Sequence, residues 1–316
     1  MSLVRARGID VLIAAALLFM PLWMAAVGGY TELATRILVM GLAAMALNFL
    51  LGFTGVLSFG HAAYFGLGAY GAAMAIKYLE TGTMAAIGVG AVIATVAAAI
   101  IGALIVRRRG VYFAMVTIAF GQVFYFLAFR WNSVTGGDDG LTGWHRQPVD
   151  LGFAAIDIFR NDGAFYYFVL VVFALCVAAM AQLIASPFGR TLLAIRENER
   201  RARFLGVPIE RRIWLSFVIS CFFVSVAGAL YALLNNFTDP RALRFDLSGN
   251  LVIMAVMGGM RSFWGPLIGA GIFVALQDYV SSHTQNWMSV IGLVYVLVVR
   301  FFPRGVLGAL RRGAAA

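Results

Sequence analysis

The sequence predicts an all-α polytopic membrane protein with about ten transmembrane or partly re-entrant helices. The chain has 316 residues, of which 62% are hydrophobic and only 12% are charged, whereas about a quarter of the residues of a soluble domain are charged. Apolar runs of about 20 residues, the length that spans a bilayer, recur along the chain. Arginines gather in the short segments between these runs, which is typical of cytoplasmic loops.

Seven apolar runs are long enough to cross a bilayer as single helices. We place them at residues 10–29, 33–51, 62–79, 84–106, 111–130, 164–184 and 213–236. The first run follows two arginines as a secretory signal would, but it continues into a second apolar run, so we interpret it as an uncleaved helix. Three shorter pieces follow at 246–260, 263–279 and 287–302. The first of these either crosses the membrane or re-enters it.

The charges predict the orientation in a bacterial inner membrane. If every segment crosses, one side receives Arg5, Arg7, residues 107–109, the loop 186–212, Arg261, Arg304, Arg311 and Arg312. The positive-inside rule makes that side cytoplasmic, with both termini inside and the loop 131–163 outside. Membrane orientation therefore accounts for the net charge of +10, and no nucleic-acid partner is expected.

The loop 186–212 is the longest charged stretch between apolar runs. Ser186 followed by Pro187 predicts a helix start, Asn198 can cap a second short helix, and Gly206 should end it. Arginines and glutamates alternate here with apolar residues such as Phe204. Such a segment either docks on a protein or lies on lipid headgroups, although a solvated basic loop is the simpler alternative. For docking on a partner we select Arg190, Arg196, Glu197, Glu199 and Gly206.

A glycine-rich stretch at 52–74 is the second unusual feature. Six glycines, with Ser58 and His61 among them, favour a close-packed or unwound element over a plain helix. A later stretch at 258–271 is also rich in glycine and contains the same Ser-Phe pair. We interpret the two stretches as related internal repeats, which many transporters contain. Polar residues at membrane depth are candidates for a substrate pathway, although they can equally join helices. The candidates are Asn48, Ser58, His61, Thr117 and Gln122.

No catalytic motif is present in the sequence. It contains no HExxH, no GxSxG and no phosphate-binding GxxxxGKS/T, and its two cysteines lie in apolar runs without metal-ligand spacing. We therefore expect a transport subunit that is not an enzyme, has no metal site and needs no cofactor of its own. Any energy from ATP must come from another subunit.

Several separated motifs resemble a known family. The run LNFLLGFTGVLSFGHAAYFGLGAYGAA at 47–73, the loop SPFGRTLLAIRENERRARFLGV at 186–207, the segment SFVISCFFVSVAGALYAL at 216–233 and the later GGMRSFWGPLIGA with FFPRGVLG resemble the permease subunits of branched-chain amino acid ABC transporters. Within that family they are similar to the LivM type. The resemblance covers most of the chain from about residue 37 onward.

This resemblance implies a type II-like ABC importer permease, with residues 1–316 as one transmembrane permease domain. The implied partners are a second related permease, two cytoplasmic ATPases that bind ATP, a periplasmic amino acid binding protein, and membrane lipid. In such importers the ATPase contact carries the pattern Glu-Ala-Ala, three residues, then Gly. Here only Ala202 and Gly206 match it, because Arg200 and Arg201 stand at the first two positions.

The function implied is import of leucine, isoleucine and valine. A urea or short-amide permease of the same family would share the scaffold. An ion-coupled secondary amino acid transporter is the alternative from another class, but it would normally carry acids deep in its spans, and Asp278 lies near the end of one.

Overall fold

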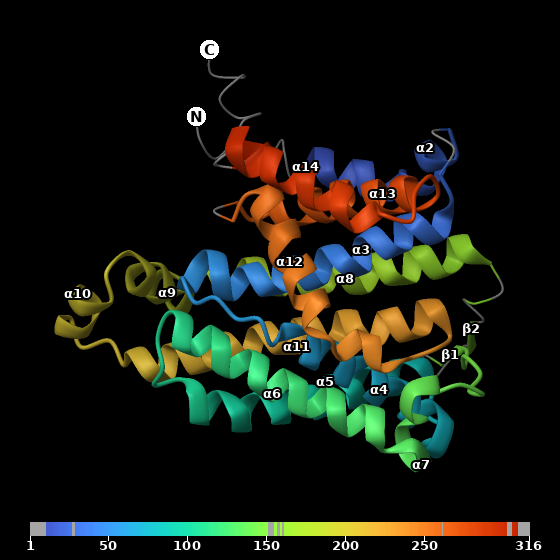
Figure 1. Ribbon diagram of the computed structural model, residues 1–316, viewed down its shortest axis with the longest axis horizontal. Helices are drawn as coiled ribbons and strands as arrows, with labels where there is room; N and C mark the ends of the chain where they lie inside the picture. The colour runs from blue at the N-terminus through green and yellow to red at the C-terminus, as the bar shows by residue number, and fades with distance from the viewer. Residues whose placement is uncertain are drawn as a thin grey trace.

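The computed structural model describes residues 11–26, 29–150, 155–156, 159, 161–260, 262–301 and 305–308. Most of its helices run along the long axis of the molecule (Figure 1). Among the described residues, five helices are long and apolar enough to cross a membrane, namely Thr31–Thr54, Thr83–Ile105, Val111–Arg130, Asp162–Ala185 and Ile209–Asn235. The predicted all-α polytopic fold is confirmed.

The elements follow one another with few long connections. The first half contains a helix over residues 11–18, then α2 (Met20–Ala26), α3 (Thr31–Asn48), the π-helix η1 (Phe49–Thr54), α4 (His61–Leu79), α5 (Thr83–Ile105), α6 (Val111–Arg130), α7 (Asn132–Thr135) and η2 (Gly137–Asp139). Two strands of two residues, β1 (Val149–Asp150) and β2 (Ala155–Ile156), pair antiparallel. The second half contains α8 (Asp162–Ala185), α9 (Pro187–Glu197), α10 (Glu199–Phe204), α11 (Ile209–Asn235), η3 (Pro240–Leu243), α12 (Phe245–Gly258), α13 (Gly265–Ser281) and α14 (Trp287–Phe301).

The first predicted span is not one continuous helix. Residues 11–18 and α2 are separated at Phe19, and residues 27–28 lie outside the described ranges. Tyr166 of α8 donates its hydroxyl to the carbonyl oxygen of Leu17 over 2.5 Å, and Trp23 donates its indole N–H to Ala16. These side chains satisfy carbonyl groups next to the break, which a membrane environment requires.

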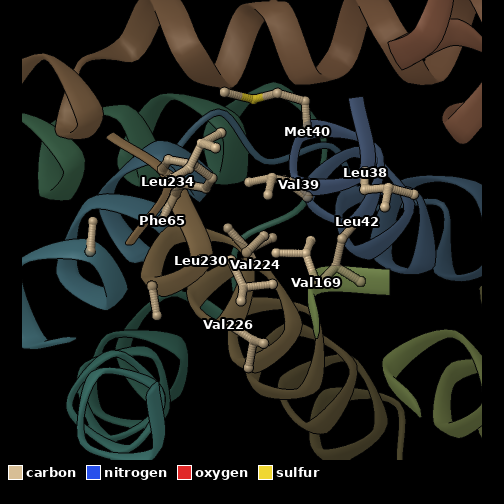
Figure 2. Close-up of a cluster of buried hydrophobic side chains, with 14 of the residues drawn as sticks. Leu38, Val39, Met40, Leu42, Phe65, Val169, Val224, Val226, Leu230 and Leu234 are labelled. Atoms are coloured by element: carbon tan, nitrogen blue, oxygen red, sulfur yellow. The ribbon is translucent and has the colours of Figure 1, made fainter. Parts of the chain in front are cut away.

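The core lies where α3, α4, α8 and α11 meet. Figure 2 shows side chains of all four helices converging there, among them Leu42 of α3, Phe65 of α4, Val169 of α8 and Leu230 of α11. The apolar residues of α3 are buried along almost its whole length. This helix is therefore surrounded by protein, whereas α5, α6 and α8 each expose one face.

Glycines set the distance between α4, α5 and α11. A Cβ atom at Gly68 would overlap the carbonyl oxygen of Ser225, one at Gly228 would overlap that of Phe65, and one at Gly90 would overlap that of Gly68. Small residues at such crossings allow the backbones of membrane helices to touch. The three helices are thus packed backbone to backbone.

Replacing Gly228 by leucine should therefore disrupt this packing. We expect the protein to lose more than about 3 kcal/mol of stability, the upper end for added core volume, because the neighbouring group is backbone and cannot rotate away. Thermal stability of the detergent-solubilised chain, followed by size-exclusion chromatography, measures the loss. Gly88→Leu is the matched control, since a Cβ at Gly88 meets nothing within 4 Å. Equal stability of the two variants would contradict this account.

The two large loops lie at opposite ends of the molecule (Figure 1). At one end, the 131–163 segment receives a hydrogen bond from Lys77 at the end of α4 and forms a β-bridge between Leu141 and Thr238, just after α11. At the other, which we call the arginine-rich end, Arg109 contacts Glu199 of α10. The described parts of the 131–163 and 186–212 loops, which the sequence places on opposite sides of the membrane, therefore lie at opposite ends of the molecule.

The segment predicted at 246–260 forms one short helix, α12, which follows the short 3-10 helix η3. Its helix α12 has 14 residues and is about 21 Å long, too short for a hydrocarbon layer of about 30 Å. The chain nevertheless passes from Thr238, at the end away from the arginines, to Ser262, whose carbonyl oxygen accepts a hydrogen bond from Asn48 near the other end of α3. Figure 1 shows α12 running steeply across the other helices. The segment thus extends from one end of the molecule toward the arginine-rich end through a short helix that lies at a steep angle to the long ones.

Candidate functional site

The glycine-rich stretch contains a break between two helices. The π-helix η1 ends at Thr54, and Gly55 has a φ of 80° that starts a non-helical segment, which we call the irregular segment (residues 55–60). The helix α4 resumes at His61. The expectation of an unwound element is confirmed for the irregular segment, whereas residues 61–74 are helical.

Side chains from three other helices hydrogen-bond to this region. Phe59 donates its backbone N–H to the Thr117 hydroxyl of α6 over 3.2 Å, and Ala62 donates its own to the Ser248 hydroxyl of α12 over 2.8 Å. The hydroxyls of Thr54 and of Ser216 in α11 lie 2.6 Å apart. A break in a buried helix leaves backbone groups without partners, and these hydroxyls replace them.

His61 is the fully buried centre of a hydrogen-bonded chain. Its Nδ1 lies 3.0 Å from the Ser58 hydroxyl, its Nε2 lies 2.9 Å from the Ser220 hydroxyl of α11, and Ser220 donates to the carbonyl oxygen of Ala46 in α3 over 2.6 Å. Because the Ser220 proton is used in that bond, Nε2–H donates to Ser220 and Nδ1 accepts from Ser58. A neutral imidazole thus joins α3, α4 and α11.

This arrangement predicts that His61→Leu lowers stability. The two serine hydroxyls would lose their buried partner, and an unsatisfied buried polar group costs about 1–3 kcal/mol. The melting temperature of the purified chain measures the effect, with His145→Leu as the control because His145 is exposed. If His61→Leu kept full stability but lost transport, His61 would contact the substrate instead.

The other two predicted pathway residues differ from each other. Asn48 is buried, donates to the carbonyl oxygen of Ser262 over 3.3 Å, and has an Oδ1 atom without a partner. A Cβ at Gly52 would overlap that Oδ1 and the carbonyl oxygen of Met260, so the two glycine-rich stretches pack on each other. Gln122 is half-buried on α6, and no hydrogen bond is described for it within the ranges that the structure covers.

A cavity of about 700 Å³ opens next to the irregular segment at the arginine-rich end. Its apolar walls include Val56, Leu57 and Phe59, and its charged walls include Arg108 and Arg109. Residues 195–199 close the side formed by the 186–212 loop. None of the five predicted pathway residues lines this cavity. Neighbours of Ser58 in the irregular segment line it instead.

The 186–212 loop forms the two predicted short helices. The Ser186 hydroxyl accepts a hydrogen bond from the Gly189 N–H at the start of α9, and the Asn198 side chain accepts one from the Arg201 N–H at the start of α10. Gly206 has a φ of 79° just beyond α10, a conformation that favours glycine. The local capping chemistry therefore fixes this loop as a helix–break–helix unit.

Four charged residues hold this unit against the membrane helices. Arg109 contacts Glu199 at 3.2 Å and Glu210 at 3.8 Å, and Arg203 contacts the same two glutamates at 3.3 and 2.8 Å. Glu199, expected to pair with a partner protein, therefore has partners within this chain. Glu197 and Arg190 are exposed.

Arg196 connects α9 to the break. Its guanidinium donates a hydrogen bond to the carbonyl oxygen of Gly52 in η1, and its side chain covers Gly55, where a Cβ would lie 2.7 Å from Arg196 Cγ. The sequence predicts Arg196 as part of a docking surface but does not predict this contact, because Arg196 and Gly52 are 144 residues apart. A local sequence pattern cannot predict a contact between residues so far apart in the chain.

The outer tip of the loop is apolar. Phe204 is 92% exposed and Leu205 is 76% exposed, and Figure 1 shows α10 projecting from the end of the molecule beyond the membrane helices. A large exposed aromatic side chain beside arginines is typical of a protein contact.

Comparison with known proteins places these features in context. Residues 29–299 match the family model described as the branched-chain amino acid transport system permease component. The chain is 26% identical over 302 residues to the high-affinity branched-chain amino acid transport system permease protein LivM of Escherichia coli, covering 90% of this chain and 71% of that protein. It is 32% identical over 143 residues to LivH of the same organism, covering 44% of this chain and 46% of LivH. No solved structure matches the chain.

Proposed function

The chain belongs to the family of branched-chain amino acid transport permeases, and on that premise we propose that it is a permease subunit of an ATP-driven ABC importer for leucine, isoleucine and valine. It is a multi-pass membrane protein with apolar helices long enough to span the inner membrane. Its likeness to both LivM and LivH indicates a second, related permease as its partner.

The remaining partners follow from the division of labour in such an importer. Two ATPase subunits would bind ATP in the cytoplasm, and a periplasmic binding protein would deliver the amino acid. This chain would be the transport subunit and would carry no cofactor or catalytic site of its own. The arginine-rich end would face the cytoplasm, together with both termini.

The structure of the α9–α10 unit is the main support for an ATPase partner. It is capped at both helix starts, tied to Arg109 by ion pairs, and exposes Phe204 at its tip. A rigid, exposed aromatic side chain has the character of an interface hot spot. We assign the ATPase contact to this tip, with Arg190 and Glu197 at its polar rim and Gly206 setting the turn beside it.

The same unit reaches the membrane interior through Arg196. Movement of α9 with a docked ATPase would displace the carbonyl oxygen of Gly52 and with it the irregular segment, as rigid-body motions at interfaces do. The cavity beside that segment has apolar walls and nearby arginines, which suits a zwitterion with an apolar side chain. In this proposal Val56, Leu57 and Phe59 border the pathway.

The predicted pathway residues take two roles in this proposal. Ser58, His61 and Thr117 hold the irregular segment in place through the hydrogen bonds described above, and Asn48 joins the end of α3 to Ser262 in the second glycine-rich stretch. Gln122, which is half-buried on the neighbouring helix α6, stays a candidate for direct contact with the substrate.

Purification of the tagged chain from its native membrane in mild detergent tests the proposal. We expect an ATPase and a second permease to co-purify, and the reconstituted complex with its binding protein to take up leucine, isoleucine and valine when ATP is supplied inside the vesicles. Preferential uptake of urea would assign the chain to the alternative substrate class. Uptake that needs no ATP and is abolished by a protonophore would contradict the pumped mechanism.

A further inference from the structure

A second cavity, of about 280 Å³, lies at the end of the molecule away from the arginine-rich end. It is bounded by the starts of α3 and α8, the end of α11 and the 131–163 segment. Its volume is just below the range of about 300–1,000 Å³ that is usual for pockets holding drug-sized ligands. The space therefore suits a smaller molecule.

Arg146 forms the positive wall of this cavity. Its guanidinium donates to the carbonyl oxygen of Leu234 over 2.5 Å and lies 5.3 Å from the ring centroid of Phe159 and 5.8 Å from that of Phe165. Its Nε atom is buried without a hydrogen-bond partner. Within the described ranges no carboxylate lies close enough to Arg146 to form an ion pair. The guanidinium is thus held in place by a backbone carbonyl group and two aromatic rings, and its charge is not neutralised by a described carboxylate.

Two carboxylates form the negative wall. Glu32 lies in the first turn of α3 and Asp162 in the first turn of α8, positions where the helix dipole favours negative charge. Burial lowers the pKa of Arg146, and the charges of Asp162 and Glu32 act in the opposite direction. The carboxylates line the same cavity as the guanidinium and are near enough to influence it.

We propose that this cavity is a binding site for a zwitterionic α-amino acid with an apolar side chain. The ligand carboxylate would pair with Arg146, whose planar fork suits that geometry, and its ammonium group would lie between Glu32 and Asp162. The rings of Phe159 and Phe165, with Leu234, would hold the apolar side chain. This inference rests on the proposed function, because the cavity would be the first place on the permease itself at which the same substrate binds.

The arrangement favours a small ligand over an acidic surface of the binding protein. Arg146 is half-buried and held by a backbone carbonyl group, so it does not project toward a docking protein. The cavity is lined by charges of both signs, which suits the two charged ends of an amino acid, whereas a purely acidic partner would be repelled by Glu32 and Asp162.

Binding of radiolabelled L-leucine to the full chain in lipid nanodiscs, without the binding protein, tests the site. We expect saturable binding that unlabelled leucine abolishes and that leucinol, which lacks the carboxylate, and 4-methylpentanoate, which lacks the ammonium group, compete for at least about tenfold more weakly. Arg146→Lys and Asp162→Asn should each weaken leucine binding by about tenfold or more. Asp138→Asn, an exposed carboxylate on the same side, should leave it unchanged.

Two outcomes would overturn the inference. One is the absence of saturable binding to the unmodified chain, and the other is equal affinity of the Asp162→Asn variant and the unmodified chain. ATP-driven leucine uptake by the complete transporter is measured separately. If uptake is normal while the chain alone binds no leucine, the site is refuted and the proposed function stands. If leucine binds but no ATP-driven uptake occurs, the proposed function fails and the site stands.

Discussion

Replacing Arg196 by methionine is expected to uncouple the transporter, so that ATP hydrolysis continues while amino acid uptake is lost. Arg196 donates to the carbonyl oxygen of Gly52, a group that the end of η1 leaves without a helical partner. Methionine retains an apolar stem but supplies no donor. Since coupling free energies between sites are typically about 1–3 kcal/mol, we expect uptake per ATP hydrolysed to fall by about tenfold or more.

Proteoliposomes in which ATP hydrolysis and leucine uptake are measured together provide the test. The matched control is Arg190→Met, on the same helix, because Arg190 is exposed and has no described ion pair. That variant should keep a normal ratio of uptake to hydrolysis. If Arg196→Met also keeps a normal ratio, the contact between α9 and η1 does not transmit motion.

Replacing both Phe204 and Leu205 by aspartate should prevent the ATPase from assembling with the permease. These two side chains are 92% and 76% exposed, so the substitution removes no packing within this chain. Loss of an interface hot-spot residue costs about 2 kcal/mol or more, which corresponds to an association weakened by about thirtyfold. Two added carboxylates should increase that loss by burying unpaired charge.

Co-purification of the ATPase with the tagged permease measures this effect. Leu79→Asp serves as the control, because Leu79 is also largely exposed but lies at the end of α4, away from the arginine-rich end. The control should retain the ATPase. Normal recovery of the ATPase with the double aspartate variant would show that the tip of α10 is not the docking surface.

Local chemistry made much of the fold predictable from the sequence. The Ser186 and Asn198 caps act within four residues of the helices they begin, and so the boundaries of α9 and α10 follow from the sequence alone. Glycine density at 52–74 likewise indicated the irregular segment. The length of α12 was less predictable, because a short apolar piece can cross the molecule when it is joined to another one, as η3 is joined to α12.

The candidate site was less predictable than the fold. His61 is a candidate from the sequence because a histidine at membrane depth is costly, yet the serines that hydrogen-bond to it include Ser220, 159 residues away. Glu199 was expected to face a partner, and the ion pair that occupies it comes from Arg109. In both cases the residue type showed that a polar partner was needed, and only the tertiary structure identified that partner.

Site-specific photo-crosslinking from position 204 tests the central claim most directly. A benzophenone amino acid placed there in the intact transporter, with position 79 as the control at the opposite end, should form a covalent adduct with the cytoplasmic ATPase from position 204 only. Addition of ATP should change the yield of that adduct, because the proposed motion passes through α10. Adducts with lipid alone from position 204, or ATPase adducts from position 79 as well, would contradict the docking of an ATPase on the α9–α10 unit.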